Sequence, residues 1–192
     1  KFIFEVLGKS ETPRYEYILK LLANMIQTPE IRTERLCILT SVEQATGKTT
    51  VYHLLKALLG KRYVKFHNNL SRLTARFNGE NAFRLVIFVD DITSASKKTT
   101  RELFPLCTSD TSTIEHKGQK PFNVDEYSNI FITANETSPL YVSTEDRRQL
   151  ILGVSDCRKG DREFFTKIHT EFNTDEGGLR DAKNSGPYRI SP

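Results

Sequence analysis

Four short groups of polar residues in this sequence have types that could act on a phosphorylated substrate. They are Gly47-Lys48-Thr49, the adjacent acids Asp90 and Asp91, Asn135, and the pair Arg147 and Arg148. Lysine adds positive charge beside phosphates, and a hydroxyl with a carboxylate can hold Mg²⁺, which prefers oxygen ligands. A second carboxylate can act on an attacking water, an amide can hydrogen-bond the terminal phosphate, and an arginine can stabilise transition-state charge. Together these residue types predict hydrolysis of a nucleoside triphosphate.

The segment 36–59 has the organisation of a phosphate-binding loop. A short apolar run predicts a buried strand, a polar loop follows, and helical spacing begins after Gly47-Lys48-Thr49. In that context backbone N–H groups and the helix N-terminus face the phosphates. The first glycine of the G-x-x-x-x-G-K-[ST] pattern is replaced by Val42, which lacks the easy access of glycine to positive φ. An ordinary loop before a helix is the alternative. The residues expected at the nucleotide are Val42, Glu43, Gln44, Ala45, Thr46, Gly47, Lys48, Thr49 and Thr50.

The elements needed to position these residues are those of an α/β protein with a parallel central sheet flanked by helices. Strands are expected at 35–40, 63–66, 84–91, 129–135 and 149–154, and helices behind Thr12-Pro13 and at 48–59, 99–107 and 164–172. Thr12 is expected as a helix N-cap and Gly60 as a left-handed helix end. A short helix is expected within 71–77, and 2–7 is either a strand or the end of a helix. Because ligands bind at the carboxyl ends of parallel strands, Lys48, Asp90 and Asn135 should meet there.

A β-hairpin with a basic tip is predicted between residues 112 and 124. Two short strand-like segments flank residues 116–120, which contain His116, Lys117, Gly118 and Lys120. Such a tip can reach phosphate oxygens of a passing nucleic-acid strand. A solvated hairpin turn is the alternative.

The length and composition of the chain limit the classes of protein to which it can belong. The chain has 192 residues, of which 38% are hydrophobic, enough for one domain with a core, and its net charge of +4 permits a nucleic-acid partner. The three widely spaced cysteines predict reduced thiols in an intracellular protein rather than disulfides or a zinc site. No apolar run approaches the ~20 residues of a membrane span. The absence of an initial Met suggests a piece of a larger protein. We divide it into an N-terminal helical segment (1–34), a core (35–172) and an irregular tail (173–192).

The order of these motifs resembles that of the superfamily 3 helicases, which are AAA+-type motors of small viruses, phages and mobile elements. Thr40–Thr50 looks like their Walker A motif, Phe88–Ile92 like Walker B, Ser112–Gly118 like the B′ hairpin, and Ile130–Asn135 like motif C. Asp146-Arg-Arg148 matches their arginine-finger region. The chain is most similar to the helicase modules of phage and poxvirus-type primase-helicases and primase-polymerases, over roughly residues 15–172.

The resemblance implies an ATP-dependent DNA helicase motor domain. It implies ATP and Mg²⁺ as cofactors, a homo-oligomeric ring, usually hexameric, single-stranded DNA in the central channel, and a linked primase or polymerase domain. Expected roles are phosphate binding by Lys48, Mg²⁺ binding by Thr49 and Asp90, action on water by Asp91, and sensing of the γ-phosphate by Asn135. Arg147 or Arg148 would complete a neighbouring site, and His116, Lys117 and Lys120 would contact DNA. It also implies a location inside the host cell.

Two other functions fit parts of the sequence. A P-loop kinase acting on a small molecule would use the same loop and acids without needing a ring. A non-hydrolysing nucleic-acid-binding or assembly module would be consistent with Val42 in the loop.

Overall fold

The computed structural model describes residues 1–92, 95–136, 140 and 146–173. The tail predicted over 173–192 therefore lies outside the described residues, apart from Asn173.

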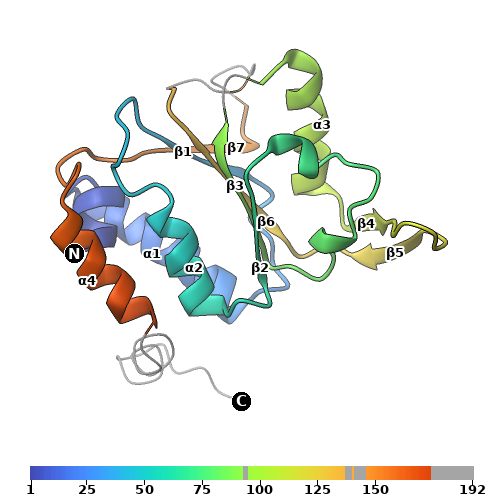
Figure 1. Ribbon diagram of the computed structural model, residues 1–192, viewed down its shortest axis with the longest axis horizontal. Helices are drawn as coiled ribbons and strands as arrows, with labels where there is room; N and C mark the ends of the chain where they lie inside the picture. The colour runs from blue at the N-terminus through green and yellow to red at the C-terminus, as the bar shows by residue number, and fades with distance from the viewer. Residues whose placement is uncertain (93–94, 137–139, 141–145, 174–192) are drawn as a thin grey trace.

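A five-stranded parallel sheet organises the protein, with strand order β2-β3-β6-β1-β7 (Figure 1). The strands are β1 Leu36–Thr40, β2 Val64–His67, β3 Val86–Ile92, β6 Asn129–Ala134 and β7 Gln149–Gly153. All residues of β1 and β6 are buried, as expected for central strands covered on both faces. The predicted strands and their parallel arrangement are confirmed.

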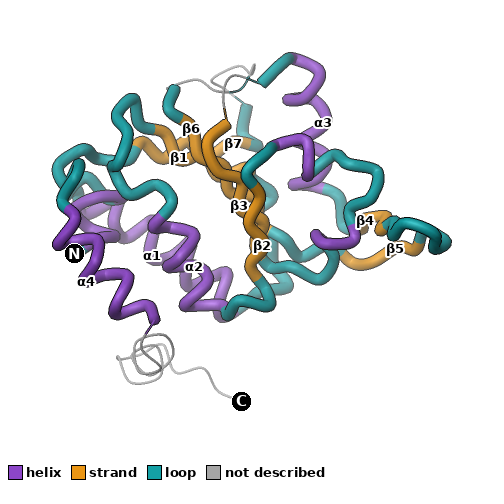
Figure 2. Tube along the Cα trace, viewed as in Figure 1, coloured by secondary structure: helices purple, strands orange, loops and turns teal. Residues whose placement is uncertain are grey.

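Helices cover both faces of this sheet. On one side lie α1 Thr12–Gln27, α2 Thr50–Leu59 and α4 Arg162–Asn173, and on the other lie α3 Lys97–Thr108 and a hairpin of β4 Thr111–Ile114 and β5 Phe122–Asp125 (Figures 1 and 2). Three short helical segments complete the described chain: η1 Phe2–Leu7, η2 Leu70–Arg72 and η3 Gly79–Asn81.

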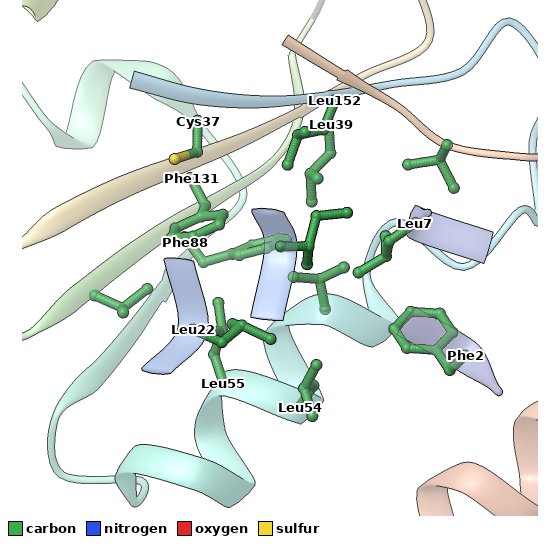
Figure 3. Close-up of a cluster of buried hydrophobic side chains, with 14 of the residues drawn as sticks. Phe2, Leu7, Leu22, Cys37, Leu39, Leu54, Leu55, Phe88, Phe131 and Leu152 are labelled. Atoms are coloured by element: carbon green, nitrogen blue, oxygen red, sulfur yellow. The ribbon is translucent and has the colours of Figure 1, made fainter. Parts of the chain in front are cut away.

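The larger of two hydrophobic cores joins the first helical layer to the sheet. Phe88 and Phe131 project from β3 and β6 toward Leu22 of α1 and Leu55 of α2 (Figure 3). Phe2 of η1 closes the end of the same cluster. The second core, which contains Leu103 and Cys107, fills the space under α3. The sheet is thus buried on both faces, so polar side chains are accessible mainly where its strands end.

Several local predictions need correction. Helix α1 begins one residue early, with Glu11 at the N-cap and no side-chain capping bond, so Thr12 is already helical. Gly60 does have a positive φ of 91°, but its ψ of 146° is extended rather than left-handed helical. In place of the helix within 71–77 there is only the turn η2. Residues 2–7 form a helical turn, which decides between the two alternatives.

The cysteines are free thiols, and burial raises the pKa of Cys37 and Cys107 to about 12. None of the helices in the described residues is long and apolar enough to cross a membrane.

Candidate functional site

One cavity of about 750 Å³ gathers three of the four predicted groups. It opens at the carboxyl ends of β1, β3 and β6, where the chain leaves the sheet. Its lining includes Thr46, Gly47, Lys48, Thr49, Asp90, Asp91 and Asn135. The side chains that were expected to meet therefore share one site, although up to 89 residues separate them along the sequence.

The loop between β1 and α2 folds around its own lysine. Lys48 Nζ donates hydrogen bonds to the backbone oxygens of Ser41 and Glu43, at 3.4 and 3.2 Å. The Ser41 hydroxyl donates to the same Glu43 oxygen and lies 3.1 Å from the Thr46 hydroxyl. Burial lowers the pKa of Lys48 below its ordinary value, while the charges of Asp91 and Asp90 oppose that shift. The ammonium is held close to both carboxylates, where it could meet a phosphate.

The position of Val42 explains how the loop forms without its first glycine. Val42 is 71% exposed and does not have a positive φ, so glycine is not needed there. The positive φ values of this loop fall instead at Ala45 (57°) and Gly47 (95°). Val42 and Glu43 line a separate hollow rather than the 750 Å³ cavity. The side chains of these two residues therefore do not line the cavity that contains Lys48.

A β-bulge aims both acids of β3 into the cavity. The register runs from Val89 opposite Ile132 to Ile92 opposite Ala134, which leaves one extra residue on β3. The backbone accommodates the extra residue at Asp91, which has a positive φ of 52°. In a regular strand, neighbouring side chains would point to opposite faces.

Each acid then has a separate partner. The Thr49 hydroxyl donates to Asp90 at 3.1 Å from Oδ2, and Asn135 Nδ2 donates to Asp91 Oδ1 at 2.5 Å. The two adjacent carboxylates are therefore distinguished by their neighbours. Asp90 accepts a hydrogen bond from the loop residue Thr49, and Asp91 accepts one from Asn135, just after β6.

Thr133 is a site residue that sequence reasoning missed. Its hydroxyl donates to Asp90 Oδ1 at 2.5 Å and accepts from the backbone N–H of Asp91 at 2.7 Å. The side chain is only 1% exposed. A signal was available, because Thr133 is a hydroxyl residue directly after the buried apolar run Ile130–Ile132 and two positions before Asn135.

The pair of Thr49 and Asp90 suits a hydrated magnesium ion. Two neighbouring ligands of octahedral Mg²⁺, each at 2.0–2.1 Å, lie about 2.9 Å apart. The observed separation of 3.1 Å between the Thr49 and Asp90 oxygens is close to that value. The described residues contain no group of three or more His, Cys, Asp or Glu side chains suited to a metal. An ion here would therefore depend on water and substrate oxygens for its other ligands.

Arg147 and Arg148 lie at the amino ends of the strands, whereas the cavity lies at their carboxyl ends. The Arg148 carbonyl accepts from the N–H of Leu36, which begins β1, whereas the loop follows the end of that strand. The five residues of β1 span about 16 Å. Within one chain these arginines are therefore remote from the cavity, and the structure does not bring them to Lys48.

Arg147 and Arg148 also differ in their surroundings. Arg148 Nε and Nη2 donate to the two oxygens of Asp146 at 2.9 and 2.7 Å, and its guanidinium lies 4.2 Å from the centroid of the Phe104 ring. Hydrogen bonding to Arg148 lowers the pKa of Asp146 to about 2. Arg147 is exposed, and its side chain makes no hydrogen bond or ion pair with the described residues.

The predicted hairpin is present on the α3 side of the sheet, away from α2 and α4 (Figure 1), and none of its residues lines the cavity. Lys117 and Lys120 are exposed at its tip, and Gly118 turns the chain with a φ of 79°. His116 is turned back toward the body of the protein. Its ring stacks on Phe122 at 6.1 Å between centroids and fills the space beside Gly79. The two lysines are thus presented outward, whereas His116 supports the tip.

Helix α4 forms a second wall of the cavity, which the sequence analysis did not anticipate. Arg162, Phe165, Thr166 and His169 all line it. Their spacing corresponds to one face of a helix, whereas the sequence predicted the helix at 164–172 without placing any of its residues at the site.

Comparison with known proteins identifies the family of this chain. A model of a family of unknown function (DUF5906) matches residues 39–148. The chain belongs to this family. The DUF5906 match runs from the end of β1 to Arg148, so it includes the loop, the acids of β3, the hairpin and Asn135.

Individual relatives carry the comparison further. The chain is 24% identical over 140 residues to the DNA primase-polymerase of Nitratiruptor phage NrS-1, covering 70% of this chain but only 19% of the relative. Two structures of the NrS-1 C-terminal region match with TM-scores of 0.77 and 0.76, at 21% and 20% identity. They cover 98% and 93% of this chain, and 44% and 43% of the solved chains. The shared fold is established, and the chain spans a minor part of these relatives.

Proposed function

We propose that this chain is the ATPase motor domain of a DNA helicase. In this proposal ATP hydrolysis between the subunits of a ring, with six subunits expected, drives movement along single-stranded DNA during replication of a phage, virus or mobile element. The core would span residues 35–172 and act inside the host cell. The observation that carries the proposal is the meeting of Lys48, Thr49, Asp90, Asp91 and Asn135 in one cavity at the ends of three parallel strands.

Within that cavity each side chain has a distinct proposed role. Lys48 leaves the backbone oxygens that it now contacts and binds the β- and γ-phosphates. Thr49 and Asp90 hold Mg²⁺, which would neutralise charge developing on the phosphate oxygens. Asp91 orients the attacking water and accepts its proton. Asn135, which donates to Asp91, is the proposed sensor, with its amide donating to the γ-phosphate.

The position of the arginines favours action between subunits. They lie at the amino ends of the strands, away from the cavity of their own subunit. In a ring, one of these arginines would instead contact the nucleotide bound in the cavity of a neighbouring subunit. Arg148 is engaged by Asp146 and Phe104. Arg147 is therefore the proposed finger, a role worth about 10³–10⁵ in rate in other nucleotide hydrolases.

The hairpin provides the proposed DNA contact. Lys117 and Lys120 would bind the backbone of the strand, with His116 holding the tip in shape. The relative named as a DNA primase-polymerase supports a role in replication, and it supports a covalently linked primase or polymerase domain in the complete protein.

Measuring ATPase activity with and without single-stranded DNA, alongside the oligomer mass, tests this function. We expect DNA-stimulated hydrolysis by an oligomer and its loss in Lys48→Ala with the fold retained. Lys56→Ala on α2, which lies outside the cavity, is the matched control. Full turnover in Lys48→Ala would overturn the assignment. Phosphate transfer to a small molecule would instead identify a kinase, and DNA binding without ATP binding would identify an assembly module.

A further inference from the structure

The cavity is larger than the phosphate chemistry of the loop and the acids requires. Its lining includes Lys48, Thr49, Asp90 and Asn135 on the sheet side, and it extends to residues of α4. On α4 the lining residues are Arg162, Phe165, Thr166 and His169, spaced i, i+3, i+4 and i+7 along one helix face. No role in hydrolysis has been given to any of them.

The residues just before α4, and α4 itself, contact the loop. The Gly160 N–H donates to the Ala45 carbonyl at 3.2 Å, and Lys159 forms an ion pair with Glu43 at 2.5 Å. The ring of Phe165 lies against Gly47 so closely that a Cβ built there would be 2.6 Å from Phe165 Cε1. An aromatic face therefore stands next to the backbone that would hold the phosphates, within reach of the rest of a nucleotide.

The chemistry of this face suits the nucleoside half of a nucleotide. Phe165 is half-buried, which leaves part of its ring for a base to stack on. Thr166 and His169 offer groups that can hydrogen-bond a ribose or a base edge. The cavity lining on α4 contains a cation, Arg162, and no carboxylate.

The neighbouring helix keeps this face in position. His169 meets His53 of α2 edge-on, with ring centroids 4.6 Å apart. Phe165 also packs edge-on against Phe2, at 6.4 Å between centroids. Figure 1 shows α4 running beside α2 from the loop end of the molecule. Because α2 begins at the loop, α4 and the loop form one continuous surface.

We propose that α4 is the nucleoside-binding element of this site, with the base stacked on Phe165 and with Thr166 and His169 at its edge. This proposal rests on the proposed nucleotide hydrolysis at the same cavity. It adds that affinity for the base comes from a helix more than a hundred residues after the loop, and that Gly47 is required both for its backbone conformation and for the space taken by Phe165.

Binding measurements with ATP and with inorganic tripolyphosphate, each with Mg²⁺, test the proposal on the full chain. In Phe165→Ala we expect ATP affinity to fall about ten- to a hundredfold and tripolyphosphate affinity to stay unchanged. Phe165→Tyr should retain ATP affinity. Lys167→Ala is the matched control, because Lys167 lies on α4 outside the cavity and pairs with Glu163. Equal losses for both ligands would show that Phe165 only shapes the loop and would overturn the proposal.

A measurement on the unaltered chain keeps the proposal testable if Phe165→Ala does not fold. Photolabelling with 8-azido-ATP should mark residues 162–173, and excess ATP should prevent it. Labelling confined to another segment would overturn the nucleoside assignment. If tripolyphosphate binds and ATP binds no more tightly, only the nucleoside assignment fails. If neither ligand binds, the proposed function fails with it.

Discussion

Thr133 and Asp91 are joined by a hydrogen bond that stabilises the bulge in β3. The Asp91 N–H, which the bulge removes from the regular ladder, donates to the Thr133 hydroxyl at 2.7 Å. The same hydroxyl donates to Asp90 at 2.5 Å. One buried side chain thus satisfies a backbone donor and orients a carboxylate, so the directions of both acids depend on it.

Replacing Thr133 tests that dependence. In Thr133→Val the shape is nearly kept, but the Asp91 N–H loses its acceptor, which should cost about 1–3 kcal/mol of stability. Because the carboxylates lose their orientation, ATP turnover should fall about 10²-fold. Thr133→Ser keeps the hydroxyl and should remain near the original rate. Urea unfolding and steady-state ATPase assays measure the two effects. A fully active Thr133→Val protein would mean that the acids are oriented by other contacts.

The two arginines should give separable phenotypes. We expect Arg147→Ala to lose about a thousandfold or more of the ATPase rate of the oligomer. Arg148→Ala should mainly lower stability, because it removes the partner of Asp146. Mixing Arg147→Ala with Lys48→Ala should restore part of the activity, since some interfaces then combine an intact loop with an intact arginine. No recovery on mixing would argue against action between subunits.

Lys117 should contribute to DNA affinity through charge alone. Lys117→Ala should weaken binding of single-stranded DNA and reduce the slope of log affinity against log salt by about 0.7. DNA-independent ATPase activity should not change, because no residue of the hairpin lines the cavity. Lys167→Ala, which removes the same charge from α4, serves as the control. Unchanged DNA affinity in Lys117→Ala would exclude the hairpin role.

His67 should make stability depend on pH between 5 and 7. It is 5% exposed, its Nε2 lies 2.7 Å from the Asn81 side-chain oxygen, and Glu80, Lys65 and Arg72 surround it. Burial lowers its pKa from the ordinary value of 6.5. The unfolded chain therefore binds the proton first as pH falls, so stability is complete above 6.5 and declines below it.

The measurement compares unfolding free energies at pH 7 and pH 5. His67→Gln should show a smaller decline than the original protein. His53, whose pKa burial also lowers, should account for part of the remainder. Measuring at pH 5 and not below limits any contribution from Glu80, whose pKa is lowered from 4.5. An identical decline in His67→Gln would assign the effect to other groups.

Local sequence patterns were enough to predict the strands, the helices and the polar side chains at the strand ends. Continuous apolar runs such as Ile130–Ile132 predict buried parallel strands, and polar residues after them predict a site at the carboxyl ends. The strands could be predicted because a strand buried on both faces must be a continuous run of apolar residues. Lys48, Asp90 and Asn135 were predicted in this way to meet, and all three line one cavity.

The directions of those side chains depend on contacts between segments and could not be predicted from the sequence. The bulge at Asp90 and Asp91 arises from a mismatch between β3 and β6, and neither strand shows it alone. The separation of Arg147 from Lys48 follows from the pairing of β7 with β1, and the α4 wall follows from packing between segments more than a hundred residues apart. These features depend on contacts between distant parts of the chain, whereas sequence patterns report the surroundings of each segment separately.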